Sequence, residues 1–285
     1  MSKIMILSKA KKPIISPRDC ALLIGIPIER SSFIRKLEGP RDGNFAESFR
    51  AHSPELSWTG YEPMAERLSN LASEVENLGV HVFRSMRLED LAIASRHRQV
   101  TVVSHSRSAL FRAADIIDIP RIRTALSSTQ NGIPIPEDAT GLAEFLNARY
   151  FKMHHKSDDN LGAPVRFQME LIETRVRFTE SLPGAFRGGA GVEFADGFRP
   201  FHDIASHFPS NFNGVIDLIV CNSLLPAELL RNHCPRSLVI ATSDLTFPVT
   251  RLPFYMATIR LLDRIPRPYD DAVEELNRIL RREFA

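Results

Sequence analysis

The chain has 285 residues, of which 44% are hydrophobic and 25% charged, a balance typical of a folded globular protein. Its 36 Lys and Arg residues are offset by 34 Asp and Glu residues, and the net charge of +2 gives no sign of a nucleic-acid-binding surface. No stretch approaches the roughly 18 apolar residues of a membrane-spanning helix, and the apolar stretch near the N-terminus is too short for a signal peptide. We therefore expect a soluble, cytoplasmic protein with no membrane or nucleic-acid partner.

The first part of the chain alternates between apolar runs and amphipathic segments. Residues 1–19 are basic and contain two prolines, and we expect them to form a lead-in to a single domain at 20–285. Continuous apolar runs bounded by turn residues predict buried strands, and apolar residues at three- and four-residue spacing predict helices. The expected elements are strands at 21–27, 80–83 and 99–105 and helices at 63–78 and 88–95.

The alternation resumes near the C-terminus after a long interruption. The expected elements there are strands at 215–221 and 237–242 and helices at 226–231, 252–262 and 269–284. Residues 120–214 do not alternate, and they predict an insertion with helices at 139–156 and 165–182. The order of strands and helices predicts an α/β fold with a central, mostly parallel sheet and helices on both faces.

Two potentially reactive side chains end two of the expected strands. The apolar run at 99–105 ends in His105, and the run at 215–221 ends in Cys221. Reactive groups of α/β proteins gather beyond the carboxyl ends of parallel strands. An imidazole beside a thiol can take its proton and make a thiolate nucleophile. The alternative is that Cys221 is a small buried hydrophobic residue and His105 an ordinary loop histidine.

The cysteines also bear on redox state and metals. Cys20, Cys221 and Cys234 are odd in number and lack CxxC spacing, so we expect neither a disulfide framework nor a zinc site. We expect no cofactor.

Several short segments occur in the order found in one peptidase family. Residues 20–119 and 214–280 resemble the caspase-like cysteine peptidases, specifically the bacterial CHAT branch. The segments that carry this resemblance are Ala21-Leu-Leu-Ile-Gly-Ile26, Leu37-Glu-Gly-Pro-Arg-Asp42, Val102-Val-Ser-His105-Ser106, Asp217-Leu-Ile-Val-Cys221-Asn-Ser223, Leu238-Val-Ile-Ala-Thr242, Phe254-Tyr255 and Asp271-Ala-Val-Glu-Glu-Leu276.

The resemblance implies a caspase-like three-layer sandwich and a cysteine endopeptidase that cleaves a partner protein. Cys221 would be the nucleophile, and His105 the general base and acid. The backbone N–H groups of Cys221 and Ser106 would stabilise the oxyanion. Relatives of this kind act in bacterial defence or cell-death systems and are often latent until an activating partner or ligand orders their site, and the chemistry needs no metal.

The residues that would select a substrate are less defined. An acidic pocket would bind Arg or Lys beside the cleaved bond, and Asp244 or Asp42 could supply it. The alternative is that both are ordinary loop or capping residues. A pocket for Asp would instead need Arg, for which Arg30 and Arg35 are candidates.

Two other functions stay open. The family has Gly where this chain has Ser106, which favours a catalytically inactive binding or scaffold module as the alternative. Residues 104–108 also resemble the nucleophile elbow of α/β-hydrolases, with Ser106 as nucleophile. That fold requires an acid and then a His after the Ser, but no His follows Asp244, since the last is His233.

Overall fold

The computed structural model describes residues 4–7, 13–38, 58–105, 111, 113–127, 134–154, 178, 181–186, 191–220, 223–242 and 248–283. The chain forms two compact units, one of residues 1–106 and 192–285 and the other of residues 107–191. The expected insertion at about 120–214 therefore begins and ends earlier in the structure. Residues 192–214 belong to the unit that contains the sheet.

The first unit is built on a six-stranded sheet of order β1-β9-β8-β5-β3-β4. The strands in that order are β1 (Ile4–Leu7), β9 (Leu238–Thr242), β8 (Val215–Ile219), β5 (Gln99–Val103), β3 (Cys20–Ile24) and β4 (His81–Phe83). The last five are parallel, and β1 pairs antiparallel with β9. Every residue of β3, β5 and β8 is buried, as expected for continuous apolar runs covered on both faces. The predicted mostly parallel α/β sheet is confirmed.

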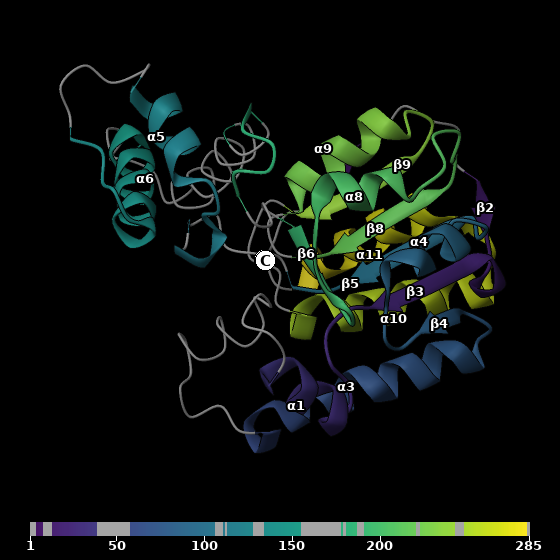
Figure 1. The fold of residues 1–285 in the computed structure, drawn as a ribbon. Coiled ribbons are helices and arrows are strands. Elements are labelled where there is room, and N and C mark those ends of the chain that lie inside the picture. The colour runs from purple at the N-terminus through teal and green to yellow at the C-terminus, as the bar shows by residue number, and fades with distance from the viewer. Residues whose placement is uncertain are drawn as a thin grey trace. The chain divides into compact units, whose positions relative to one another are not determined.

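Helices cover both faces of this sheet (Figure 1). One layer consists of α3 (Trp58–Asn77), α10 (Pro248–Arg264) and α11 (Tyr269–Glu283). The other consists of α4 (Leu88–Ala94), α8 (Phe201–Ser206) and α9 (Leu224–His233). The first layer forms the main core, where Leu22 and Val103 of the sheet pack in one cluster with Leu68 and Ile259 of the helices.

The N-terminal segment contributes more than a lead-in. Besides β1, it contains β2 (Ile14–Ile15), which pairs with β10 (Arg267–Pro268), and the 3-10 turn η1 (Pro17–Asp19). These pairings bring the start of the chain to β9 and to the segment before α11. Local composition did not indicate them, because strand pairing over such a sequence distance depends on the complete fold.

An aromatic cluster extends α3 beyond the expected helix at 63–78. The helix begins at Trp58, and the rings of Trp58 and Tyr61 lie 5.5 and 4.7 Å from that of Phe33 in α1 (Arg30–Glu38). Tyr61 also donates a hydrogen bond to the carbonyl of Pro27. These contacts stabilise an extra helical turn before Pro63, where helix propensity alone predicts a start.

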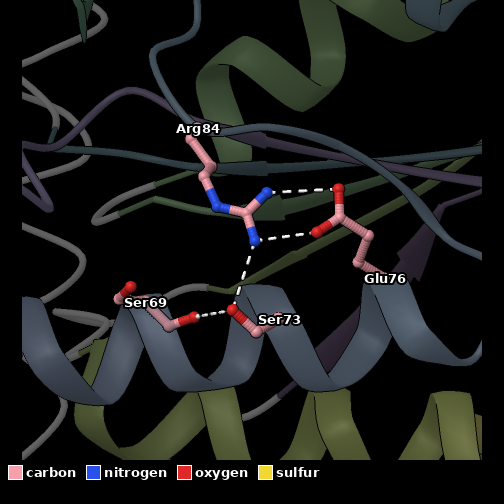
Figure 2. A network of polar contacts seen from close by, with 4 residues as sticks. All are labelled: Ser69, Ser73, Glu76 and Arg84. Atoms are coloured by element: carbon pink, nitrogen blue, oxygen red, sulfur yellow. Dashed lines mark hydrogen bonds and ion pairs between the residues drawn. The ribbon is translucent and has the colours of Figure 1, made fainter.

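Arg84, the residue just after the edge strand β4, is hydrogen-bonded to α3 (Figure 2). Arg84 donates hydrogen bonds to both carboxylate oxygens of Glu76, at 3.2 and 2.8 Å. It also donates to Ser73 Oγ, whose hydroxyl donates to the carbonyl of Ser69. A strand of three residues has few ladder bonds, so side-chain contacts of this kind help to fix it.

The second unit is small and largely helical in its described part. It contains the 3-10 turn η2 (Ala113–Asp115), α5 (Ile119–Ser127) and α6 (Ala139–His154). Its core is apolar and includes Phe111, Ile122, Leu142 and Leu146. α6 agrees with the helix expected at 139–156, whereas most of the helix expected at 165–182 lies outside the described residues.

Candidate functional site

His105 lies directly beyond β5, in the middle of the sheet. β5 and β8 are parallel neighbours, and their register pairs each residue of β5 with the residue 116 positions later, from Gln99 with Val215 to Val103 with Ile219. The N–H of Ser104 donates to the carbonyl of Ile219 at 3.3 Å, which continues the contact beyond the ladder. The half-buried His105 follows.

Cys221 and several other predicted site residues lie outside the described residues. These are the candidate nucleophile Cys221, the oxyanion residue Ser106, and the substrate-binding candidates Asp42 and Asp244. In sequence, Cys221 is two residues beyond Ile219, just as His105 is two residues beyond Val103. The structure therefore places His105 and the strand that precedes Cys221, and it leaves the dyad itself a prediction.

A strand that sequence reasoning missed holds the backbone of His105. β6 (Gly191–Phe194) pairs with β7 (Gly197–Pro200). The N–H of Glu193 donates to the carbonyl of His105 at 2.9 Å, and Ser104 Oγ donates to the carbonyl of Glu193. The N–H of Ala195 donates to the carbonyl of Met86 at 2.8 Å. β6 thus crosses the carboxyl end of the sheet and connects the segments that follow β5 and β4.

Gly25 makes room for this crossing. A Cβ at Gly25 would lie only 2.3 Å from the carbonyl oxygen of Glu193 and 2.7 Å from Ser104 Oγ. Only glycine avoids a clash when another backbone approaches so closely. β3 and β5 are the strands between which the order of the parallel strands reverses, a common place for ligand sites in α/β proteins. In this chain β6 lies against the residues that follow these two strands.

A buried ion pair links β8 to α10. Arg251 donates to one carboxylate oxygen of Asp217 at 2.8 Å, and Tyr269 donates to the other at 2.8 Å. Burial raises the pKa of Asp217, although the charge of Arg251 and the hydrogen bonds from Tyr269 and Arg251 oppose that shift. This contact fixes the first turn of α10 to β8, the strand that leads to Cys221.

The two described cysteines are poor nucleophiles. Cys20 and Cys234 are both fully buried, and their thiols donate to the carbonyls of Ser16 and Pro209, each at 3.3 Å. Burial, together with the charge of Asp19, raises the pKa of Cys20 far above its usual value, and burial raises that of Cys234 to about 11. At neutral pH both remain thiols, so Cys221 is left as the candidate reactive cysteine.

Within the described part of the chain, no three His, Cys, Asp or Glu side chains come together in an arrangement that could hold a metal ion. Among those same residues, no helix is both long and apolar enough to cross a membrane.

Comparisons of the chain with models of protein families, with curated proteins and with solved structures find no match. Its function must therefore be argued from its own residues and geometry.

Proposed function

We propose that this protein is a caspase-like cysteine endopeptidase in which Cys221 is the nucleophile and His105 the general base. The observation that carries the proposal is the register of β5 and β8. The two strands are adjacent and parallel, and the 116-residue offset that relates their paired residues also relates His105 to Cys221. Residues at equal distances beyond two neighbouring parallel strands start from the same edge of the sheet, where a thiol and an imidazole can meet.

The reaction would proceed through an acyl-enzyme. His105 takes the proton of the Cys221 thiol, and the thiolate attacks the carbonyl carbon of the scissile peptide bond. The backbone N–H groups of Cys221 and Ser106 stabilise the resulting oxyanion, each contributing about 3 kcal/mol. The carbon–nitrogen bond then breaks, and the leaving amine takes the proton from His105. Water, deprotonated by His105, hydrolyses the thioester and regenerates the thiol.

The surroundings of His105 support a role as a positioned base. The carbonyl of His105 accepts a hydrogen bond from the N–H of Glu193. The hydroxyl of Ser104, the preceding residue, donates a hydrogen bond to the carbonyl of Glu193. These contacts fix the backbone from which the imidazole projects. Catalytic groups that are held by rigid elements and neighbouring hydrogen bonds need less reorganisation during the reaction.

Substrate and setting follow from the resemblance. The substrate would be a partner protein, cleaved after Arg or Lys if Asp244 or Asp42 lines the pocket. An activating partner or ligand would order the site, as in defence or cell-death systems that keep a peptidase latent.

Thiol reactivity gives a direct test. The folded protein is treated with iodoacetamide at pH 7 and the modified cysteines are identified by peptide mass spectrometry. We expect Cys221 to react far faster than Cys20 and Cys234, because thiolate fraction largely sets the rate. His105→Ala should slow the labelling of Cys221, whereas His233→Ala, a matched control at the end of α9, should not. Equal labelling of Cys221 in wild type and His105→Ala would exclude the dyad.

The second candidate function is a catalytically inactive binding module. The specific observation in its favour is β6, which packs against Gly25 and Ser104 at the ends of β3 and β5. Slow labelling of all three cysteines, together with no cleavage of an Arg- or Lys-containing peptide library, would favour this module over the peptidase.

A further inference from the structure

Two histidine rings meet at the amino end of the sheet, opposite the carboxyl end, where His105 lies. His81 is the first residue of the edge strand β4, and His97 lies in the bend that precedes β5. Nδ1 of His81 and Nε2 of His97 are 3.1 Å apart. β3 lies between β4 and β5 in the sheet, so this contact spans the amino end of β3.

Both rings also make aromatic contacts. The ring of His81, an exposed residue, stacks on that of Phe83, with centroids 4.4 Å apart and an interplanar angle of 25°. The half-buried ring of His97 meets that of His81 edge-on, with centroids 5.2 Å apart. The contact between the two nitrogens is a hydrogen bond in which one donates and the other accepts. An ion can bind both nitrogens only after the proton of this hydrogen bond has left.

The spacing of the two nitrogens fits coordination to one ion. Two imidazole nitrogens bound at the usual Zn–N distance with tetrahedral geometry lie about 3.3 Å apart. The observed 3.1 Å, which is the hydrogen-bond distance in the metal-free protein, is only about 0.2 Å shorter, so a small movement of the rings would bring both nitrogens to one ion.

Carboxylates supply negative charge around the pair. Asp19 interacts electrostatically with His97, and Glu76 with His81. Each carboxylate is also paired with an arginine, since Arg98 lies 3.9 Å from Asp19 and Arg84 lies 2.8 Å from Glu76. These arginines offset the negative charge, so the spacing of the two ring nitrogens is what favours an ion.

We propose that His81 Nδ1 and His97 Nε2 bind a divalent transition-metal ion such as zinc. The described residues provide no third side chain for it, so water would complete its coordination. Zinc and similar ions suit imidazole ligands, whereas magnesium and calcium prefer oxygen. A bound ion would fasten the short edge strand β4 to the start of β5 across β3. Its position at the amino end of the strands makes it structural and independent of the proposed peptidase chemistry.

The test is zinc titration of the folded chain by isothermal calorimetry at pH 7.5. The variants His81→Ala and His97→Ala are compared with the wild type and with a control, His207→Ala. The ring of His207 is hydrogen-bonded to the backbone carbonyl of Asp203. We expect each of the first two variants to lose at least tenfold in affinity, and the double variant to lose no more than either one, because one ion needs both rings. His207→Ala should bind as the wild type does.

A second measurement separates metal binding from damage to the fold. Zinc should raise the thermal unfolding midpoint of the wild type but not of either pair variant, while circular dichroism confirms that all are folded without metal. Zinc affinity that is unchanged in His81→Ala or in His97→Ala would overturn the proposal, because the ion would then be bound elsewhere in the chain.

Discussion

Asp217 and Arg251 form an ion pair inside the core, with an N–O distance of 2.8 Å and side chains that are 3% and 5% exposed. Asp217 lies in the centre of the sheet, and Arg251 reaches it from the first turn of α10. Tyr269 of α11 donates to the second carboxylate oxygen. One carboxylate therefore connects a central strand to two helices of the covering layer, α10 and α11.

Breaking this pair should be costly. Asp217→Ala leaves the guanidinium of Arg251 buried without its counter-charge, and we expect a loss of about 3–5 kcal/mol in the free energy of unfolding. Tyr269→Phe removes only one hydrogen bond to a charged acceptor and should cost about 1.5–3 kcal/mol. Urea denaturation of both variants measures the difference. A smaller loss in Asp217→Ala than in Tyr269→Phe would contradict the central role of the ion pair.

Gly25→Ala should push β6 away from the sheet. The added methyl group would meet the carbonyl of Glu193 and the hydroxyl of Ser104, neither of which can move without breaking a hydrogen bond. We expect a loss of about 1–3 kcal/mol in the free energy of unfolding. Hydrogen exchange should also show reduced protection of the Glu193 amide, which is bonded to His105.

Gly184→Ala is the matched control. Its φ is +81° but the space around it is open, so backbone strain alone should cost about 1 kcal/mol. The prediction for Gly25→Ala would be wrong if the Glu193 amide kept its wild-type protection in that variant, because β6 would then tolerate the methyl group.

His97 should make stability depend on pH. Burial and the nearby His81 lower the pKa of His97 in the folded protein, although the backbone of Arg18 and the charge of Asp19 oppose this. The unfolded chain, with a histidine pKa of about 6.5, therefore binds the proton more readily. The contribution of His97 to stability is fully present above about pH 6.5 and is lost as the pH falls through the lower, folded pKa.

The measurement is the urea midpoint between pH 8 and pH 5 in metal-free buffer. We expect it to decrease less steeply in His97→Gln than in the wild type, because glutamine does not titrate. An equal slope in the two proteins would assign the pH dependence to other groups.

The alkylation of Cys234 should depend on pH differently in the folded and in the unfolded protein. Its pKa is raised to about 11 by burial, so alkylation should stay slow up to about pH 10 and rise only above it. In urea-unfolded protein the same cysteine should react in the usual range near its unperturbed pKa of about 8.5. Fast native labelling of Cys234 at pH 7 would contradict its burial and would remove the selectivity on which the test of Cys221 depends.

Local sequence patterns predicted much of the sheet but not its connections at the carboxyl end. The apolar runs before His105 and Cys221 predicted β5 and β8, since strands covered on both faces must be apolar throughout. β6 was missed because it has only four residues and makes its decisive contacts with Ser104 and His105, almost ninety positions earlier in the chain.

The sequence by itself determined that β3, β5 and β8 are buried and that His105 and Cys221 follow two of them, whereas the edge strand β4 is exposed to half-buried. Only the tertiary structure decided that β5 and β8 are neighbours with a 116-residue offset, and that Gly25 faces the backbone of Glu193. It also brought His81 and His97 together across β3. Hydrophobic periodicity depends on nearest neighbours along the chain, whereas register and ring-to-ring contacts depend on how distant segments pack. That packing is settled only when the whole core forms.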